Sequence, residues 1–341
     1  MFGGNGNDFF ASGAAGDIFD GGAGIDIIDY QFSATGVTVT LGLLPGQPGT
    51  GSGGDQIVNV EHVYGSYHDD TLKGSNEANQ LEGRDGADTL YGYGGDDLIV
   101  GGSGIDAMYG GTGDDSFIVD DAGDLVFETA GEGYDQLYAL VSYVLAAGQH
   151  VESLRLATNF ENHDLAGNEL ANELIGNDGA NVLAGHGGND VLWGGDGADR
   201  LEGGSGDDVY YIDAADEIVE LAGEGYDTVF TAISYVLPAH VERLVVTDLG
   251  SLTSLSLTGN ALANEITGNA GANLLDGGAD ADLMFGGEGN DAYIVDDIGD
   301  QIVEAVDVGY DTVFAKVSYT LPRSDRRYRR RCRRRCPRPR T

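Results

Sequence analysis

A nine-residue period is the feature that most limits what this chain of 341 residues can fold into. Eighteen nonapeptides fall into four arrays, which start at Gly3, Gly65, Gly167 and Gly259. Glycine holds the first position in 17 of them, the sixth position is Asp in 13 and Asn in 5, and the eighth is apolar or aromatic in all 18. Because a fixed short period is the signature of a repeat architecture, the chain is predicted to form a solenoid.

Each column of the repeat has a physical role. The glycine-rich first half permits the positive φ angles of a tight turn, and the next three residues suit a short strand. Side chains alternate between the faces of a strand, so the eighth residue points inward while the seventh and ninth point outward. One such strand buries little, so stacked turns must supply the core, at about 2 kcal/mol per buried large apolar side chain. The predicted fold class is all-β, a solenoid of parallel strands.

The motifs GGAGIDIID, GRDGADTLY and GGSGIDAMY resemble the GGxGxDxUx nonapeptide of the RTX, or haemolysin-type calcium-binding, repeat family. The resemblance implies a parallel β-roll, a right-handed β-solenoid in which two nonapeptides form one turn, so that residues eighteen positions apart stack. It also implies that calcium ions (Ca2+) lie between neighbouring turns, bound by sixth-position carboxylates and by backbone carbonyls of the glycine-rich corners.

The chemistry of the sixth column agrees with that implication. Stacked strands repeat at about 4.8 Å, so a row of aspartates is unfavourable without a counter-cation. Calcium takes about six to eight oxygen ligands and accepts carbonyls, whereas magnesium retains its waters. The candidate metal ligands are the sixth-position aspartates: Asp8, Asp17, Asp26, Asp70, Asp88, Asp97, Asp106, Asp115, Asp190, Asp199, Asp208, Asp282 and Asp291.

The register ranks these candidates. Five pairs eighteen apart are Asp at both ends and should bind calcium most tightly: Asp8 with Asp26, Asp70 with Asp88, Asp88 with Asp106, Asp97 with Asp115, and Asp190 with Asp208. Pairs that contain Asn carry one charge fewer and should be weaker, because charge count tunes calcium affinity. The fourth array has only such mixed pairs, Asn264 with Asp282 and Asn273 with Asp291, so we expect it to fill last.

Longer segments separate the arrays, and those that begin at Phe117, Tyr210 and Tyr293 repeat one another. Their alternating β-branched and aromatic residues predict strands, so we expect spacers that cap and restart the roll as wider turns. The predicted organisation is a partial array (1–29), a spacer (30–64), an array (65–120), a spacer (121–166), an array (167–213), a spacer (214–258), an array (259–296), a truncated spacer (297–322) and a disordered arginine-rich tail (323–341).

Charge separates the body of the chain from this tail. Residues 1–322 hold 56 acidic and 6 basic residues, whereas eleven arginines and both cysteines lie between Arg323 and Arg340. The body lacks the positive surface that nucleic acids require, and it has no thiol for a disulfide or a zinc site. The sequence has no apolar run long enough to span a membrane and no recognisable cleaved signal peptide. Because the chain opens in the middle of a repeat, we expect it to be a piece of a longer protein, with an end that is truncated, frame-shifted or a genuine basic tail.

No catalytic motif is recognisable, since HExxH, phosphate-loop and EF-hand patterns are absent and the matched His150 and His240 favour packing or surface roles. The expected function is calcium binding by a non-enzymatic β-roll that folds when calcium binds. The resemblance implies an extracellular or cell-surface location reached through type I secretion. Two alternatives stay open: the accessory module of a secreted protease, lipase or polysaccharide epimerase, and an adhesin or surface-layer array. The sequence identifies no protein or polysaccharide partner.

Overall fold

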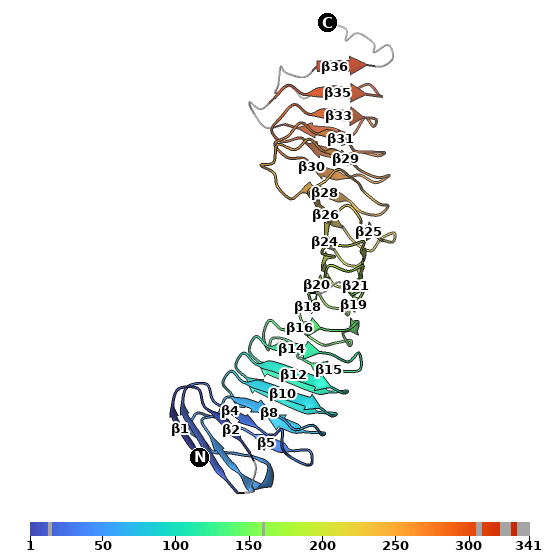
Figure 1. Cartoon of the computed structure of the whole chain (residues 1–341). Helices are drawn as coiled ribbons and strands as arrows, with labels where there is room; N and C mark the ends of the chain where they lie inside the picture. Colours follow the sequence, from blue (N-terminus) through green and yellow to red (C-terminus); the bar gives the residue numbers. More distant parts are fainter. Residues whose placement is uncertain (13–15, 159–160, 305–308, 321–328, 333–341) are drawn as a thin grey trace. The chain divides into compact units, whose positions relative to one another are not determined.

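The computed structural model describes residues 1–12, 16–158, 161–304, 309–320 and 329–332, and almost all regular structure among them is β-strand (Figure 1). The chain divides into two compact units, Met1–Asp178 and Gly179–Thr341. In each unit short strands pair in parallel with strands one turn away. The predicted fold class, a parallel β-solenoid, is confirmed.

Among its described residues the first unit has twenty strands and one short 3-10 helix. These elements are β1 (Phe2–Asn5), β2 (Phe9–Ala11), β3 (Ile18–Ala23), β4 (Ile27–Asp29), β5 (Thr38–Thr40), β6 (Gly49–Thr50), η1 (Ser52–Gly54), β7 (Gln56–Val58), β8 (His62–Tyr64), β9 (Thr71–Lys73), β10 (Gln80–Asp85), β11 (Thr89–Gly94), β12 (Leu98–Ser103), β13 (Ala107–Thr112), β14 (Ser116–Val119), β15 (Leu125–Phe127), β16 (Gln136–Ala139), β17 (Tyr143–Val144), β18 (Ser153–Leu156), β19 (Leu165–Ala166) and β20 (Glu173–Ile175).

The second unit continues the numbering. Its described strands are β21 (Val182–Gly187), β22 (Val191–Trp193), β23 (Arg200–Ser205), β24 (Val209–Ile212), β25 (Glu217–Ile218), β26 (Thr228–Thr231), β27 (Tyr235–Val236), β28 (Arg243–Val246), β29 (Ser256–Thr258), β30 (Glu265–Thr267), β31 (Leu274–Asp276), β32 (Leu283–Phe285), β33 (Ala292–Val295), β34 (Gln301–Val303), β35 (Thr312–Ala315) and β36 (Arg329–Cys332). The tail that we expected to be disordered contributes β36, which pairs in parallel with β35; the rest of the tail lies outside the described residues.

Apart from β5, β6 and β7, which share a sheet, alternate strands of the first unit belong to different sheets. One sheet runs β1-β3-β7-β6-β5-β9-β11-β13-β15, a second runs β2-β4-β8-β10-β12-β14-β16-β18-β20, and β17 pairs with β19 in a third. Within the second array Leu81 pairs with Ile99 and Leu90 with Met108, so equivalent residues are eighteen apart. Strands β10, β12 and β14 accordingly follow one another along the stack (Figure 1). Two nonapeptides therefore make one turn, as the resemblance implied.

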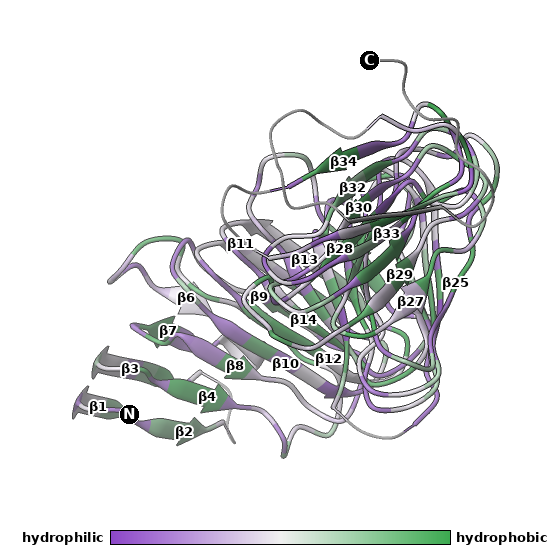
Figure 2. Ribbon diagram, turned by 90° about the horizontal axis from the view of Figure 1, so that it is seen from above, coloured by the Kyte–Doolittle hydropathy of each residue, from purple (hydrophilic) through white to green (hydrophobic). Residues whose placement is uncertain are grey.

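The eighth column forms the core. All 18 of its side chains are buried, and Leu72, Leu90, Ile99 and Tyr210 among them are 0 % exposed. Most of their neighbours at the seventh and ninth positions are more accessible, as along β3, although Asp29 at the end of β4 is buried. Apolar and polar segments adjoin along both strands (Figure 2). The period-2 prediction for these short strands is confirmed, because the inward face is apolar along each stack.

The spacers continue the stack with turns of other lengths. In the second spacer Phe117 pairs with Leu137 and Leu137 with Leu154, which are turns of 20 and 17 residues. In the third, Val229 pairs with Leu244 after only 15 residues. The first spacer instead inserts a short antiparallel excursion, because β6 runs against both β5 and β7. These segments therefore lie within the solenoid and keep its inward-facing column.

Candidate metal centre

The sixth-position residues form a hydrogen-bonded ladder along the corners of the roll. Within an array the backbone N–H donates to Oδ1 of the equivalent residue one turn later, with N···O distances of 2.7 Å for Asp88 to Asp106 and for Asp97 to Asp115. The same bond joins Asp8 to Asp26, Asp70 to Asp88 and Asp190 to Asp208. The structure therefore brings together all five of the Asp–Asp pairs that the register predicts.

In most of the sixth-position aspartates the second carboxylate oxygen is buried without a hydrogen-bond partner. Among the described residues this holds for Oδ2 of Asp8, Asp26, Asp88, Asp97, Asp106, Asp115, Asp199, Asp208, Asp282 and Asp291. An unpaired buried oxygen, charged in the aspartate, costs several kcal/mol at least, so native proteins normally give it a partner. The ion pairs of the chain do not supply one, since Asp88, Asp97, Asp106 and Asp115 take part in none within the described ranges.

The first-position glycines make room for these oxygens. A Cβ on Gly83 would lie closer than 3.0 Å both to Oδ2 of Asp88 and to the carbonyl oxygen of Gly101, one turn later. Gly92 and Gly185 stand in the same relation to Asp97 and Asp190. A carboxylate oxygen and a backbone carbonyl oxygen thus converge over each of these Cα atoms. Such an all-oxygen donor set fits a hard cation of the calcium type.

Burial shifts the acidity of this column. It raises the pKa of Asp97 to about 8 and that of Asp88 to about 7, while the backbone N–H from the preceding turn partly opposes the shift and neighbouring carboxylates add to it. The same burial raises the pKa of Asp106, Asp115 and Asp208 to about 6. The roll therefore holds its carboxylates where negative charge is unfavourable unless a cation compensates it.

Three predicted ligands in the first array and at the start of the second have different surroundings. Asp17 is only half-buried, and its N–H donates to Oδ1 of Asp55 in the first spacer. Asp26 donates to Glu61 Oε2 in the same spacer. Both oxygens of Asp70 already accept hydrogen bonds, from the N–H of Val37 and from the N–H and hydroxyl of Ser66. Asp70 therefore depends less on a cation than the later rungs do.

Asparagine holds the sixth position in the first rungs of the later arrays, where it extends the ladder with its amide group. Nδ2 of Asn79 donates to the Glu61 carbonyl at 2.9 Å, and its N–H donates to Asp97 Oδ1. Asn264 bonds in the same way to the Val241 carbonyl and to Asp282. An amide that donates to a carbonyl one turn earlier needs no ion there, which explains why Asn replaces Asp where an array meets a spacer.

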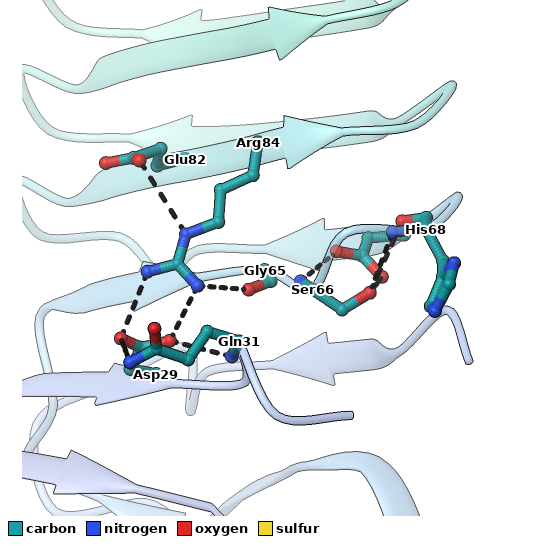
Figure 3. Close-up of polar contacts among 8 residues, drawn as sticks. Asp29, Gln31, Gly65, Ser66, His68, Glu82 and Arg84 are labelled. Carbon is teal, nitrogen blue, oxygen red and sulfur yellow. Dashed lines mark hydrogen bonds and ion pairs between the residues drawn. The ribbon is translucent and has the colours of Figure 1, made fainter. Parts of the chain in front are cut away.

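Arg84 neutralises a buried aspartate, Asp29, that lies outside the sixth-position column. Its guanidinium group donates to both oxygens of the buried Asp29 at 2.9 and 3.0 Å and to the Gly65 carbonyl at 3.1 Å (Figure 3). It also lies over the rings of Tyr64 and Tyr67. Asp29 thus has a cation from the chain itself, in contrast to the sixth-position rungs such as Asp88 and Asp97.

The ladder runs on into the spacers, which sequence reasoning missed. Asp106 donates to Asp124, Asp115 to Asp135 and Asp208 to Asp227. Asp135 and Asp227 then donate to acids of the matched His-Val-Glu triplets, Glu152 and Glu242. The repeated Gly-Tyr-Asp motif at Asp135, Asp227 and Asp311 was the available signal, but its spacing of 19 or 20 residues from the last repeat falls outside the nonapeptide period.

Three equivalent acidic groups lie where the second, third and fourth arrays end. Each has carboxylate oxygens within 4.8 Å of one another: Asp115 with Glu128 and Asp135, Asp208 with Glu220 and Asp227, and Asp291 with Glu304 and Asp311. We call them the terminal clusters. Burial, together with the nearby acids, raises the pKa of Glu128 to about 9 and that of Glu220 to about 8. The glutamates were not among the predicted ligands.

Comparison with known families bears on the same residues. The family model of the RTX calcium-binding nonapeptide repeat (4 copies) matches residues 1–28, 64–99, 91–126, 175–210 and 258–293, which cover most of the four arrays. No curated protein matches the chain. The repeat, the parallel roll and the stacked sixth-position carboxylates agree with one another, and the chain therefore belongs to the family of proteins that carry RTX calcium-binding nonapeptide repeats.

Proposed function

We propose that this protein is a non-catalytic β-roll that folds outside the cell when calcium binds between its turns. The observation that carries the proposal is the stack of buried Oδ2 atoms without hydrogen-bond partners, from Asp88 to Asp115 in the second array and again at Asp199 and Asp208 in the third. Bound calcium would supply positive charge to these carboxylates and to the corner carbonyls beside them.

Linkage supports a role for calcium in folding itself. A site with a Kd of about 0.1 mM, within the range of extracellular modules, stabilises the fold by about 1.4 kcal/mol at about 1 mM calcium and by almost nothing at sub-micromolar calcium. Several such sites in one roll add up to a free energy comparable to the whole stability of an ordinary domain. Extracellular calcium would therefore favour the folded chain, and cytosolic calcium would not.

The net charge of the chain and the use of its acids in the ladder support the proposed role outside the cell and without catalysis. The net charge of the whole chain is −40, which keeps an unfolded acidic chain extended until cations bind. Over the described residues no helix combines the length and the apolar character that crossing a bilayer requires. The repeats use their titratable groups in the ladder, where they face one another between turns.

Circular dichroism of the purified chain tests this proposal. In chelator the spectrum should lack strand signal, and millimolar calcium should produce it, whereas the same concentration of magnesium should not, because magnesium retains its waters. A chain that is already rich in β-structure in chelator contradicts calcium-driven folding.

The order in which the arrays fill is a second, independent test. The chain has a single tryptophan, Trp193, which lies in the third array and stacks on Tyr211. Its fluorescence should change at a lower calcium concentration than that of a probe in the fourth array, made by combining Trp193→Phe with Phe285→Trp. The reverse order contradicts the ranking of Asp–Asp pairs above mixed pairs.

A further inference from the structure

The terminal clusters differ from the repeating sites in the residue that closes them. Glu128 stands eighteen residues after Gly110, where a further repeat would place its first-position glycine. In place of a glycine that makes room for a carboxylate, the chain puts a third carboxylate there. A Cβ added to Gly110 would lie within 3.0 Å of both Oε1 of Glu128 and Oδ2 of Asp115.

The carboxylates of these clusters are buried and only partly satisfied. Asp115 and Asp135 are 1 % exposed and Glu128 is 2 % exposed. Glu128 Oε1 accepts the N–H of Gly111 at 3.3 Å, but its Oε2 has no partner among the described residues, nor has Oδ2 of Asp115 or Asp135. Three buried acids therefore bring carboxylate oxygens within 4.8 Å of one another, and each acid keeps one oxygen without a partner, which a simple capping role does not explain.

The third array ends in the same way. Oε2 of Glu220 and Oδ2 of Asp208 and Asp227 are buried without a partner within the described part of the chain. Oε1 of Glu220 accepts the hydroxyl of Tyr210, which in turn accepts the N–H of Gly203 at 2.9 Å. One oxygen of the glutamate is thus held by a donor while the other is buried without a partner, as in the second array.

The opposite side of the same array end shows how the chain caps a carboxylate when no ion is needed. Asp124 accepts the N–H of Asp106 on Oδ1 and the N–H groups of Asp120 and Asp121 on Oδ2. Asp216 is satisfied in the same manner by Asp199 and Asp213. Loop amides therefore complete one side of each array, whereas the terminal clusters receive a further negative charge.

We propose that Asp115, Glu128 and Asp135, and likewise Asp208, Glu220 and Asp227, each hold one divalent cation of the calcium type at the end of an array. Their oxygens lie within 4.8 Å of one another, and oxygens about 2.4 Å from a shared calcium ion can be separated by up to about 4.8 Å. Each site joins the last repeat to two acids of the spacer. The proposal rests on the proposed calcium binding of the roll but adds a site with three carboxylates.

Counting bound ions tests this site. Isothermal titration with calcium chloride of the full chain should show one fewer bound ion for Glu128→Gln and two fewer for Glu128→Gln combined with Glu220→Gln. The control is Glu77→Gln, which removes an exposed carboxylate from the same unit and should bind as many ions as the wild type. An unchanged count and affinity in the Glu128→Gln chain overturns the terminal site.

The direction of a second readout separates an ion from a shared proton. If the cluster holds calcium, Glu128→Gln should raise the calcium concentration needed for half-maximal strand signal. If it only shares protons, the substitution removes a buried charge and should leave that concentration unchanged or lower it, which overturns the proposal. Asp135→Asn should give the same upward shift while its Oδ1 still accepts the N–H of Asp115.

The wild-type titration distinguishes the two proposals. A wild-type chain that binds no calcium defeats both the proposed function and the terminal site. A wild-type chain that binds calcium, with variants that bind as many ions at the same midpoint, defeats only the terminal site.

Discussion

Replacing one first-position glycine by alanine should remove a calcium site without changing any charge. Gly83 has an ordinary negative or extended φ, so its substitution introduces no left-handed backbone strain. The new methyl group would instead overlap with Oδ2 of Asp88 and with the carbonyl oxygen of Gly101, which lies 2.5 Å from the Cβ position. Both oxygens belong to the candidate site. The carbonyl oxygen is fixed in the backbone, and the carboxylate of Asp88 is held through Oδ1 by the N–H of Asp70.

The magnitude follows from two contributions. Overpacking a close-packed position costs about 1–3 kcal/mol. Displacing the carboxylate also removes the binding free energy of one site, about 1.4 kcal/mol when calcium is present at about ten times its Kd. We therefore expect Gly83→Ala to destabilise the calcium-loaded roll by about 2–4 kcal/mol.

The assay is a calcium titration followed by circular dichroism, with the number of bound ions measured by calorimetry. Gly131→Ala is the matched control, because Gly131 lies in a spacer corner at φ 83° with nothing within 4 Å of its Cβ position. It should cost about 1–2 kcal/mol through left-handed strain alone and leave the ion count unchanged. If Gly83→Ala binds as many ions as the control, with the same midpoint, the assignment of the corner oxygens to the site is wrong.

Two further predictions concern charge. In chelator, lowering the pH from about 8 towards 5 should increase strand content. Burial raises the pKa of Asp97 to about 8, so the folded state holds protons that the unfolded chain has released, and stability is lost as the pH rises through this window. Circular dichroism that shows no gain of strand signal on acidification contradicts this prediction. Arg84→Met should destabilise the first unit by about 3 kcal/mol, because it leaves the buried Asp29 without its cation. Urea unfolding measures this loss of stability, which should far exceed the loss caused by Arg243→Met, because the ion pair of Arg243 is more exposed. The loss should shrink when Asp29→Asn is combined with Arg84→Met.

The sequence alone predicted the parts of the fold that repeat. All 18 apolar eighth-position side chains, from Phe10 to Tyr293, lie in the core as predicted, because the strand half of each nonapeptide has one inward position. The eighteen-residue spacing likewise predicted which carboxylates stack, as the bond from Asp88 to Asp106 shows. Both predictions succeeded because the nonapeptides repeat the same local backbone geometry.

The parts that escaped prediction depend on turns of unequal length. Asp135 approaches Asp115 because the turn that follows this aspartate has 20 residues, which the nonapeptide period does not predict. Glu128 does stand eighteen residues after Gly110, but the pattern predicts a glycine there. The partner of Asp17 is Asp55, 38 residues away, because an antiparallel excursion intervenes. The hydrogen bonds that satisfy Asp70 depend on Ser66, which stands where the repeat pattern has its second glycine.

Turns of 15 to 20 residues occur in the spacers, yet their strands still pair with the turns before and after them. The position of a turn in the stack is therefore set by its inward acid and its inward apolar residue, and the number of residues in the turn can vary. New segments can therefore enter at the corners of a spacer turn without disturbing the levels above and below it. An insertion of even one residue inside a nonapeptide would instead move its aspartate out of the stack of sixth-position residues. Spacers are thus the places where a roll of this kind can acquire new surface features while its ion-binding levels stay aligned.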